Sequence, residues 1–413
     1  MKQTAYSDKQ ELRSKLILFL VSPLISFFYS LKNVNSRSSY VIFFLFALYF
    51  GLSFTMKIGG AGDASRYREQ FEQWEFRGYK HLEKIVHDWA GGSDKLDDEN
   101  KDIYHVVLYY AVSRFTTNYH YLFLVISSVF AFFMLKSLKF LTNEMNGKLT
   151  WVAFILLFLF VQNNIFNING FRFWTAAWIG IYCIFQIFRN NRPIYLLLLP
   201  IAFCVHTSYM IFGVITVAIY LFKRVFHYTH TFWVTIFVIS IFVGNLLLNF
   251  FNQEMVSYLP ANFAKYTKIF DPDFMEGRQL YKSENWNYLH LLWDNIRYYY
   301  INILVFVLAR NVYTICNDKR SYYLYIFLLI FTIVCNLGQI IYTFGNRFVF
   351  LTYSIIAYLW WVTFGTKKYR WIIYLLPIAF LYEVWTNIDR WYSCTEAWFY
   401  IGNPIVNIVH YLF

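Results

Sequence analysis

Four short polar motifs interrupt the apolar blocks of this sequence, and each carries a side chain able to handle charge or protons. They are residues 59–68 with Asp63, 167–174 with Arg172, 206–208 with His206 and 345–348 with Arg347. The planar donor fork of arginine pairs bidentately with phosphate oxygens, and aspartate or histidine can move a proton or orient a hydroxyl. If these four side chains converge, they would suit a diphosphate attached to a lipid.

Each motif also has a plainer interpretation. Asp63 follows a glycine-rich turn and fits a helix N-cap, a role compatible with a site. Arg172 would serve as an interfacial anchor at the mouth of an apolar helix, and His206 as a hydrogen-bonded core histidine. The glycine-rich turn is not a phosphate-binding loop, because no Gly-Lys-Ser/Thr follows it.

The composition indicates the class of structure that must position these motifs. Of the 413 residues, 58% are hydrophobic, 23% are aromatic and 15% are charged, whereas about 25% of the residues in soluble domains are charged. This balance excludes a set of soluble domains and predicts an all-α, polytopic membrane protein. The formal charge of +12 arises mainly in short loops between apolar blocks, which favours helix orientation and anionic lipid head groups over nucleic acid.

Apolar blocks near the roughly 20 residues that a span needs predict ten to thirteen membrane segments. The candidates are residues 16–31, 39–56, 119–141, 150–163, 171–188, 231–250, 297–315, 321–341, 347–364 and 370–385. Residues 194–222 are long and polar in the middle, so we expect two short helices meeting near His206. Residues 103–116 predict a further amphipathic or partly inserted helix.

Basic residues in short loops predict the orientation. Lysines and arginines mark the turns near residues 32–37, 136–148, 189–192, 223–224, 310–320 and 367–370 as cytoplasmic. Alternation then predicts that the other loops lie outside, which puts all four motifs on the outer side. These loops are residues 57–118, 163–170, the break near His206, 251–296 and 342–346. The basic N-terminal tail does not fit if residues 16–31 cross, so that block would instead lie along the inner interface.

The chain reads as one integral membrane domain, residues 1–413, with two long extracytoplasmic loops at about 57–118 and 251–296. Loops of this length tend to be functional or disordered, and their aromatic residues argue against disorder. In the first loop, Tyr67, Phe71 and Trp74 recur at helical spacing. The five cysteines show neither metal-ligand nor disulfide-framework spacing.

The order of the motifs resembles the EpsG-like family of Wzy-type exopolysaccharide and O-antigen polymerases, over roughly residues 40–365. The resemblance lies in Gly-Asp-x-x-x-Tyr at residues 62–67, an Asn-x-x-Arg helix start, a His-Thr-Ser break and a late Asn-Arg-Phe. It implies a GT-C-like fold and a multi-pass enzyme of the bacterial inner (cytoplasmic) membrane. The active site would face the periplasm or the outside. The family often has Arg-Gln where this chain has Arg172 and Phe173.

The resemblance implies an inverting glycosyl transfer from an undecaprenyl-diphosphate-linked oligosaccharide, without a nucleotide sugar. Catalytic residues would be Asp63, Arg172, His206 and Arg347, with the arginines stabilising the leaving diphosphate. Either Asp63 or His206 would be the base, and we favour Asp63. The predicted substrate-binding residues are Arg66, Tyr67, Asn169, Asn346 and Arg278. No metal or other cofactor is expected. The expected partners are lipid-linked glycan and membrane lipid, with a chain-length regulator as a further candidate.

Other functional classes remain open. A lipid-linked oligosaccharide flippase or another transporter would line a path through the bilayer with ionisable residues at mid-depth. A membrane-bound O-acyltransferase would make His206 central and would leave the two arginines without a role. An interaction scaffold gives no reason for polar residues within apolar helices. The sequence does not separate a polymerase from a ligase that passes glycan to another acceptor, nor does it identify the sugar repeat unit.

Overall fold

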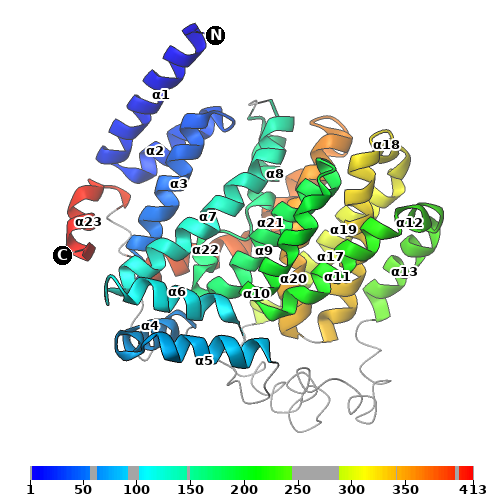
Figure 1. Cartoon of the computed structure of the whole chain (residues 1–413). Coiled ribbons are helices and arrows are strands. Elements are labelled where there is room, and N and C mark those ends of the chain that lie inside the picture. The colour runs from blue at the N-terminus through cyan, green and yellow to red at the C-terminus, as the bar shows by residue number, and fades with distance from the viewer. Residues whose placement is uncertain are drawn as a thin grey trace. The chain divides into compact units, whose positions relative to one another are not determined.

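The computed structural model is built of α-helices joined by short 3-10 and π-helical turns (Figure 1). It describes residues 2–55, 63–91, 102–146, 149–243, 288–340, 342–395 and 400–412. No strand occurs among these residues, which confirms the predicted all-α class. Most of the second long loop, with Arg278, lies outside the described residues.

The chain divides into two compact units. Unit 1 contains residues 1–214 and 385–413, and unit 2 contains residues 215–384. Three of the four motifs, those with Asp63, Arg172 and His206, belong to unit 1. The motif with Arg347 belongs to unit 2. The single integral membrane domain expected from the sequence stays a prediction.

Within the described residues, four helical runs are long and apolar enough to cross a membrane. They are α7 (Tyr119–Glu144), the run Trp151–Arg189, α19 (Lys319–Leu337) and Gly345–Phe364 within α20 (Tyr342–Phe364). A fifth is the pair α21 (Arg370–Ala379) and α22 (Leu381–Cys394), bent by 41°. The protein is therefore a multi-pass membrane protein, whereas ten to thirteen segments and the GT-C-like architecture stay predictions.

The remaining described elements include the parts of one of these runs and further helices in both units. The run Trp151–Arg189 contains α8 (Trp151–Phe160), η3 (Ile165–Gly170), α9 (Phe171–Ile184) and η4 (Phe185–Arg189). Unit 1 also contains α3 (Arg37–Leu52), α6 (Ile103–Ser113) and α23 (Pro404–Leu412). In unit 2 lie α12 (Lys223–Tyr228), α13 (His230–Val243), α17 (Tyr288–Arg310), α18 (Val312–Cys316) and η10 (Gly338–Ile340).

The first long loop is helical where it is described, as its aromatic spacing predicts. It forms α4 (Asp63–Gln73), η2 (Trp74–Phe76) and α5 (Tyr79–Ala90). Tyr67, Phe71 and Trp74 are all less than 4% exposed, at 3%, 1% and 2%. The Phe71 ring lies 6.0 Å from that of Tyr109 on α6, so the buried stripe of α4 packs against the next apolar helix.

The polar middle of residues 194–222 breaks the helix, as predicted. The segment contains η5 (Pro193–Leu198), α10 (Leu199–Val205), η6 (Thr207–Tyr209) and α11 (Met210–Leu221). His206 separates the two α-helices with an extended backbone, φ −155° and ψ 120°. The break therefore places a histidine and two hydroxyl residues in the middle of an apolar segment. In an unbroken helix, the backbone polar groups there would be hydrogen-bonded within the helix.

The N-terminal block at residues 16–31, a candidate membrane segment, is divided between two helices. Helix α1 (Lys2–Val21) ends before Pro23, which begins α2 (Pro23–Ser30), and η1 (Leu31–Asn33) follows. Proline lacks a backbone N–H and so favours the first turn of a helix over its interior. Ser22 caps α2 by accepting from the Ile25 N–H at 3.4 Å.

Gly51 allows α3 and α7 to approach closely. A Cβ atom added to Gly51 would lie 2.1 Å from Ser127 Oγ and 2.4 Å from the Phe123 carbonyl oxygen. Small residues let membrane helices bring their backbones together, which gives van der Waals contact in a solvent without a hydrophobic driving force. Gly213 in α11 offers the contrasting case, because nothing lies within 4 Å of its added Cβ.

We expect Gly51→Ala to lower the thermal stability of the purified protein, because overpacking of a close contact costs about 1–3 kcal/mol. Gly213→Ala should leave stability unchanged or raise it by about 0.5–1 kcal/mol, since alanine favours the helix. Unfolding midpoints in one detergent provide the comparison. Equal midpoints for the two variants would contradict the close α3–α7 approach.

Candidate functional site

Two of the predicted motifs meet at the start of α4. The Asn169 side-chain oxygen accepts a hydrogen bond from the Ala64 N–H at 3.0 Å. A Cβ atom added to Gly170 would lie 3.9 Å from Asp63 Oδ2. Asp63 is the first residue of α4, where a carboxylate also interacts favourably with the helix dipole. Asn169 thus joins the 59–68 and 167–174 motifs by capping a backbone N–H of α4.

The asparagine-rich turn before α9 holds its start by side-chain to backbone hydrogen bonds. The amide nitrogen of Asn163 donates to the Trp174 carbonyl at 3.1 Å, and Trp178 Nε1 donates to the Asn163 carbonyl at 2.9 Å. Asn167 Nδ2 donates to Asn163 Oδ1 at 3.1 Å. These contacts hold the first turns of α9 and therefore the backbone that carries Arg172.

Arg172 is the second residue of α9 and is held by two partners. Its Nε donates to the Tyr67 hydroxyl oxygen at 3.1 Å, and its Nη1 lies 3.1 Å from Asp102 Oδ2. The Arg172 and Asp102 side chains are only 13% and 6% exposed. Because each ion has left water, the pair is stable only with good geometry and further hydrogen bonds, and Tyr67 supplies one of them.

Asp102 was missed by the sequence analysis. It directly precedes α6 and bridges two motifs, since its Oδ1 accepts the Thr207 N–H at 2.9 Å while its Oδ2 pairs with Arg172. The signal in the sequence was an acid immediately before an apolar helix, which resembles an ordinary solvated N-cap. No side-chain capping bond forms there, so the carboxylate is committed to Arg172 and Thr207.

His206 faces the same group of residues from the break after α10. Its Nδ1 accepts the Ser208 N–H at 3.2 Å, and its ring lies edge to face with that of Phe173 at 5.2 Å. A nitrogen that accepts carries no proton, so the neutral imidazole has its proton on Nε2. We assign this tautomer from the hydrogen bond, and in it Nε2–H is a donor.

Tyr67 and Asp63 lie in different environments, because Tyr67 is buried and Asp63 is partly exposed. Burial raises the pKa of Tyr67 although Arg172 opposes the change, so the phenol stays protonated at neutral pH and its O–H can donate. Asp63 pairs with Arg66 Nη2 at 3.2 Å, and these side chains are 45% and 46% exposed. Asp63 is therefore open to an incoming group, whereas Asp102 is enclosed.

Helix α20 begins at Tyr342, five residues before the start predicted at residue 347, so the fourth motif lies in its second turn, in unit 2. A Cβ atom added to Gly345 would lie 2.6–2.8 Å from backbone atoms of Gly338 and Gln339, so only glycine allows α20 to approach η10 this closely. Arg347 is exposed and Asn346 is half-buried. Their roles, like that of Arg278, stay predictions.

No group of three or more His, Cys, Asp or Glu side chains within the described residues could hold a metal ion. The chemistry that the described site offers is that of charge and proton transfer. Arg172 presents a guanidinium, His206 an N–H, Tyr67 an O–H, and Asp63 an accessible carboxylate.

The model of the EpsG family matches residues 37–396 of the chain. This range includes all four motifs as well as Asp102. Searches of curated proteins and of solved structures returned no match.

We expect Asp102→Asn to destabilise the purified protein by about 3 kcal/mol, because it leaves the Arg172 charge enclosed without its counter-ion. The matched control is Arg66→Gln, which breaks the exposed Asp63–Arg66 pair and should change stability by less than about 1 kcal/mol. Thermal midpoints of the two variants in the same detergent test this difference. A larger loss in Arg66→Gln would refute the assignment of Asp102 as the anchor of Arg172.

Proposed function

The chain belongs to the EpsG family, which is one of polysaccharide-polymerase-like membrane proteins, and from this premise we propose that it is a polysaccharide polymerase. Its substrate would be an oligosaccharide repeat unit carried on undecaprenyl diphosphate, at the extracytoplasmic membrane face. The observation that carries the proposal is Arg172, held between Tyr67 and Asp102 beside the break at His206.

In the proposed reaction, the hydroxyl of an acceptor sugar attacks the anomeric carbon of the lipid-linked donor. The new glycosidic bond forms as the bond from that carbon to the diphosphate breaks, with inversion. The hydroxyl proton passes to a base, and undecaprenyl diphosphate leaves with the electron pair. Negative charge therefore grows on the diphosphate oxygen during the step, which is where a preorganised donor lowers the barrier most.

Arg172 suits this role because its position is fixed before substrate arrives. Nε and Nη1 are committed to Tyr67 and Asp102, which leaves further N–H groups of the planar fork for a phosphate oxygen. Its enclosure strengthens the interaction with an entering anion relative to water. Arg347 in unit 2 is proposed to provide a second positive charge to the diphosphate.

The hydrogen bonding of His206 supports a donor role and leaves the base role to Asp63. Accepting from Ser208 keeps His206 in the Nε2–H form, and protonating Nδ1 would break that bond. Nε2–H is therefore proposed to donate to the diphosphate. Asp63 is proposed as the base, because a partly exposed carboxylate beside the Tyr67 helix face is open to an acceptor hydroxyl. Arg66 and Asn169 are proposed to contact sugar.

The other functional classes are less well supported. An O-acyltransferase base would need an unprotonated histidine nitrogen facing substrate, whereas Ser208 occupies Nδ1. A transporter would need ionisable groups along a path through the bilayer, whereas Asp63, Asp102 and Arg172 gather at the beginnings of helices. The product distinguishes a polymerase, which transfers the glycan to another repeat unit, from a ligase, which transfers it to a different acceptor.

Purified protein incubated with lipid-linked repeat units should produce a ladder of longer glycans. Arg172→Ala should lower the rate by about 10²–10³-fold, because one charge-stabilising donor is lost. Arg172→Lys should recover little of it, since lysine cannot keep both the Tyr67 and Asp102 contacts while reaching a phosphate. The control is Arg192→Ala, an exposed arginine on a predicted cytoplasmic turn. A normal ladder from Arg172→Ala would remove the basis of the proposal.

The assignment of base and donor has its own test in the same assay. His206→Gln keeps an N–H donor and should lose less activity than His206→Ala. Asp63→Asn keeps shape and hydrogen bonding but cannot accept a proton, so it should lose about 10²–10⁴-fold. If Asp63→Asn is nearly active while His206→Gln is as inactive as His206→Ala, the two roles are reversed.

A further inference from the structure

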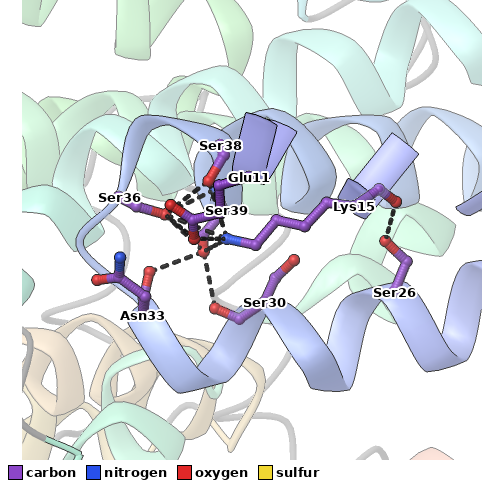
Figure 2. A network of polar contacts seen from close by, with 8 residues as sticks. All are labelled: Glu11, Lys15, Ser26, Ser30, Asn33, Ser36, Ser38 and Ser39. Carbon is purple, nitrogen blue, oxygen red and sulfur yellow. Dashed lines mark hydrogen bonds and ion pairs between the residues drawn. The ribbon is translucent and has the colours of Figure 1, made fainter. Parts of the chain in front are cut away.

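The N-terminal residues fold back on themselves before the first helix of the family match. Helix α1 ends at Val21 and α2 begins at Pro23. Across this turn, Ser26 Oγ on α2 donates to the Lys15 carbonyl oxygen on α1 at 2.8 Å (Figure 2). Residues 15 and 26 therefore lie side by side, and α1 and α2 form a helical hairpin whose tip is Ser22.

Lys15 fastens this hairpin to the start of α3. Its ammonium group donates to Glu11 Oε1 at 2.6 Å, to Ser39 Oγ at 2.7 Å and to Ser38 Oγ at 2.9 Å. The side chain is 1% exposed. Burial alone would raise the pKa of Glu11, but its hydrogen bond and charge interaction with Lys15 lower it. Glu11 is therefore ionised at neutral pH, and its carboxylate lies against the buried Lys15 ammonium group.

The open end of the hairpin, opposite its tip at Ser22, is held by the same cluster of hydrogen bonds. Ser39 Oγ lies 2.7 Å from the carbonyl oxygen of Ser30, the last residue of α2, and 2.7 Å from that of Asn33 in η1 (Figure 2). Ser36 caps α3 by accepting the Ser39 N–H at 3.1 Å. The middle of α1, the end of α2 and the beginning of α3 therefore meet around Lys15.

The part of the hairpin between Lys15 and the tip at Ser22 is too short to cross a bilayer. From Leu16 to Val21 a helix advances about 7.5 Å, at 1.5 Å per residue. Half of a hydrocarbon core is about 15 Å thick, so the tip stays within one leaflet. The apolar side chains near the tip are about half exposed, at 54% for Ile17, 59% for Val21, 53% for Ile25 and 58% for Phe28. Such exposure fits contact with acyl chains.

The open end is positively charged. Lys9, Arg13, Lys32 and Arg37 are all exposed there. Lys9 is about 9 Å along α1 from Lys15, and Arg37 lies between the serines that bind Lys15. Residues 2–40 contain two acids, Asp8 and Glu11, and Glu11 is already paired with Lys15. Basic residues at the start of α3 predict that this end faces the cytoplasm.

We propose that α1 and α2 form a re-entrant hairpin in the cytoplasmic leaflet, and that Lys9, Arg13, Lys32 and Arg37 bind the head groups of anionic phospholipids. The apolar tip holds the hairpin among the acyl chains, and the cations select the negative lipid at the surface. The family match begins at residue 37, so α1, α2 and η1 precede it. The hairpin is an anchor distinct from the extracytoplasmic site.

A photo-crosslinking residue at exposed Ser14, beside Arg13, reports the local lipid. Full-length protein is reconstituted in bilayers with equal phosphatidylglycerol and phosphatidylcholine, and adducts of each lipid are counted. We expect phosphatidylglycerol to dominate by about tenfold or more. Arg13→Gln with Lys32→Gln should remove most of that preference, at about fivefold per cation. High salt should weaken it in the unaltered protein as well, which tests the charge effect without a substitution.

The control is Lys80→Gln with Lys84→Gln, which removes the same charge from exposed positions on α5 and should leave the lipid ratio at Ser14 unchanged. Equal adducts of both lipids in the unaltered protein, or an equal fall in the control, would overturn the proposal. A second measurement tests the hairpin itself. Protease should remove an N-terminal tag in inside-out membrane vesicles, and removal only in right-side-out vesicles would show that residues 16–31 cross.

Discussion

The enclosed pair of Arg172 and Asp102 is the interaction on which the arrangement of unit 1 depends. Its members begin α9 and precede α6, and through Thr207 and Tyr67 it also reaches η6 and α4. Four segments far apart in sequence are therefore joined by one charge pair. Because removing either ion would leave the other desolvated, the pair constrains the fold and the site together, and neither can change independently.

Local patterns predicted much of the fold. Long apolar blocks predicted α7 and α19, since every helix in lipid must satisfy its backbone internally and present apolar side chains outward. The spacing of Tyr67, Phe71 and Trp74 predicted the buried face of α4, because the side-chain periodicity of a helix is a local property. The polar interruption at His206 predicted the break between α10 and α11. In each case the deciding information lies within a few turns of helix.

Features set by distant contacts were not predictable in this way. Asp102 resembles a surface acid until Arg172, 70 residues later in the chain, is seen beside it. The block at residues 16–31 has the composition of a span, but Pro23 divides it and Lys15 fastens both parts to α3. Asn169 was predicted to contact substrate, and the described contact is with the backbone of Ala64. The spacing of residues along a single sequence does not specify which distant side chains pair.

Charge arithmetic limits what unit 1 can do alone. Asp63 and Arg66 form one pair, and Asp102 and Arg172 form another. The formal charges of these four described side chains cancel, so an entering diphosphate would meet oriented N–H and O–H dipoles and one fixed guanidinium, but no excess positive charge from these two pairs. Dipoles stabilise charge without reorganisation, yet a diphosphate carries more than one negative charge. A further cation would therefore lower the barrier of the proposed reaction, and Arg347 is the residue predicted from the sequence for this role. If that prediction holds, the loss of activity in Arg347→Ala should approach that in Arg172→Ala.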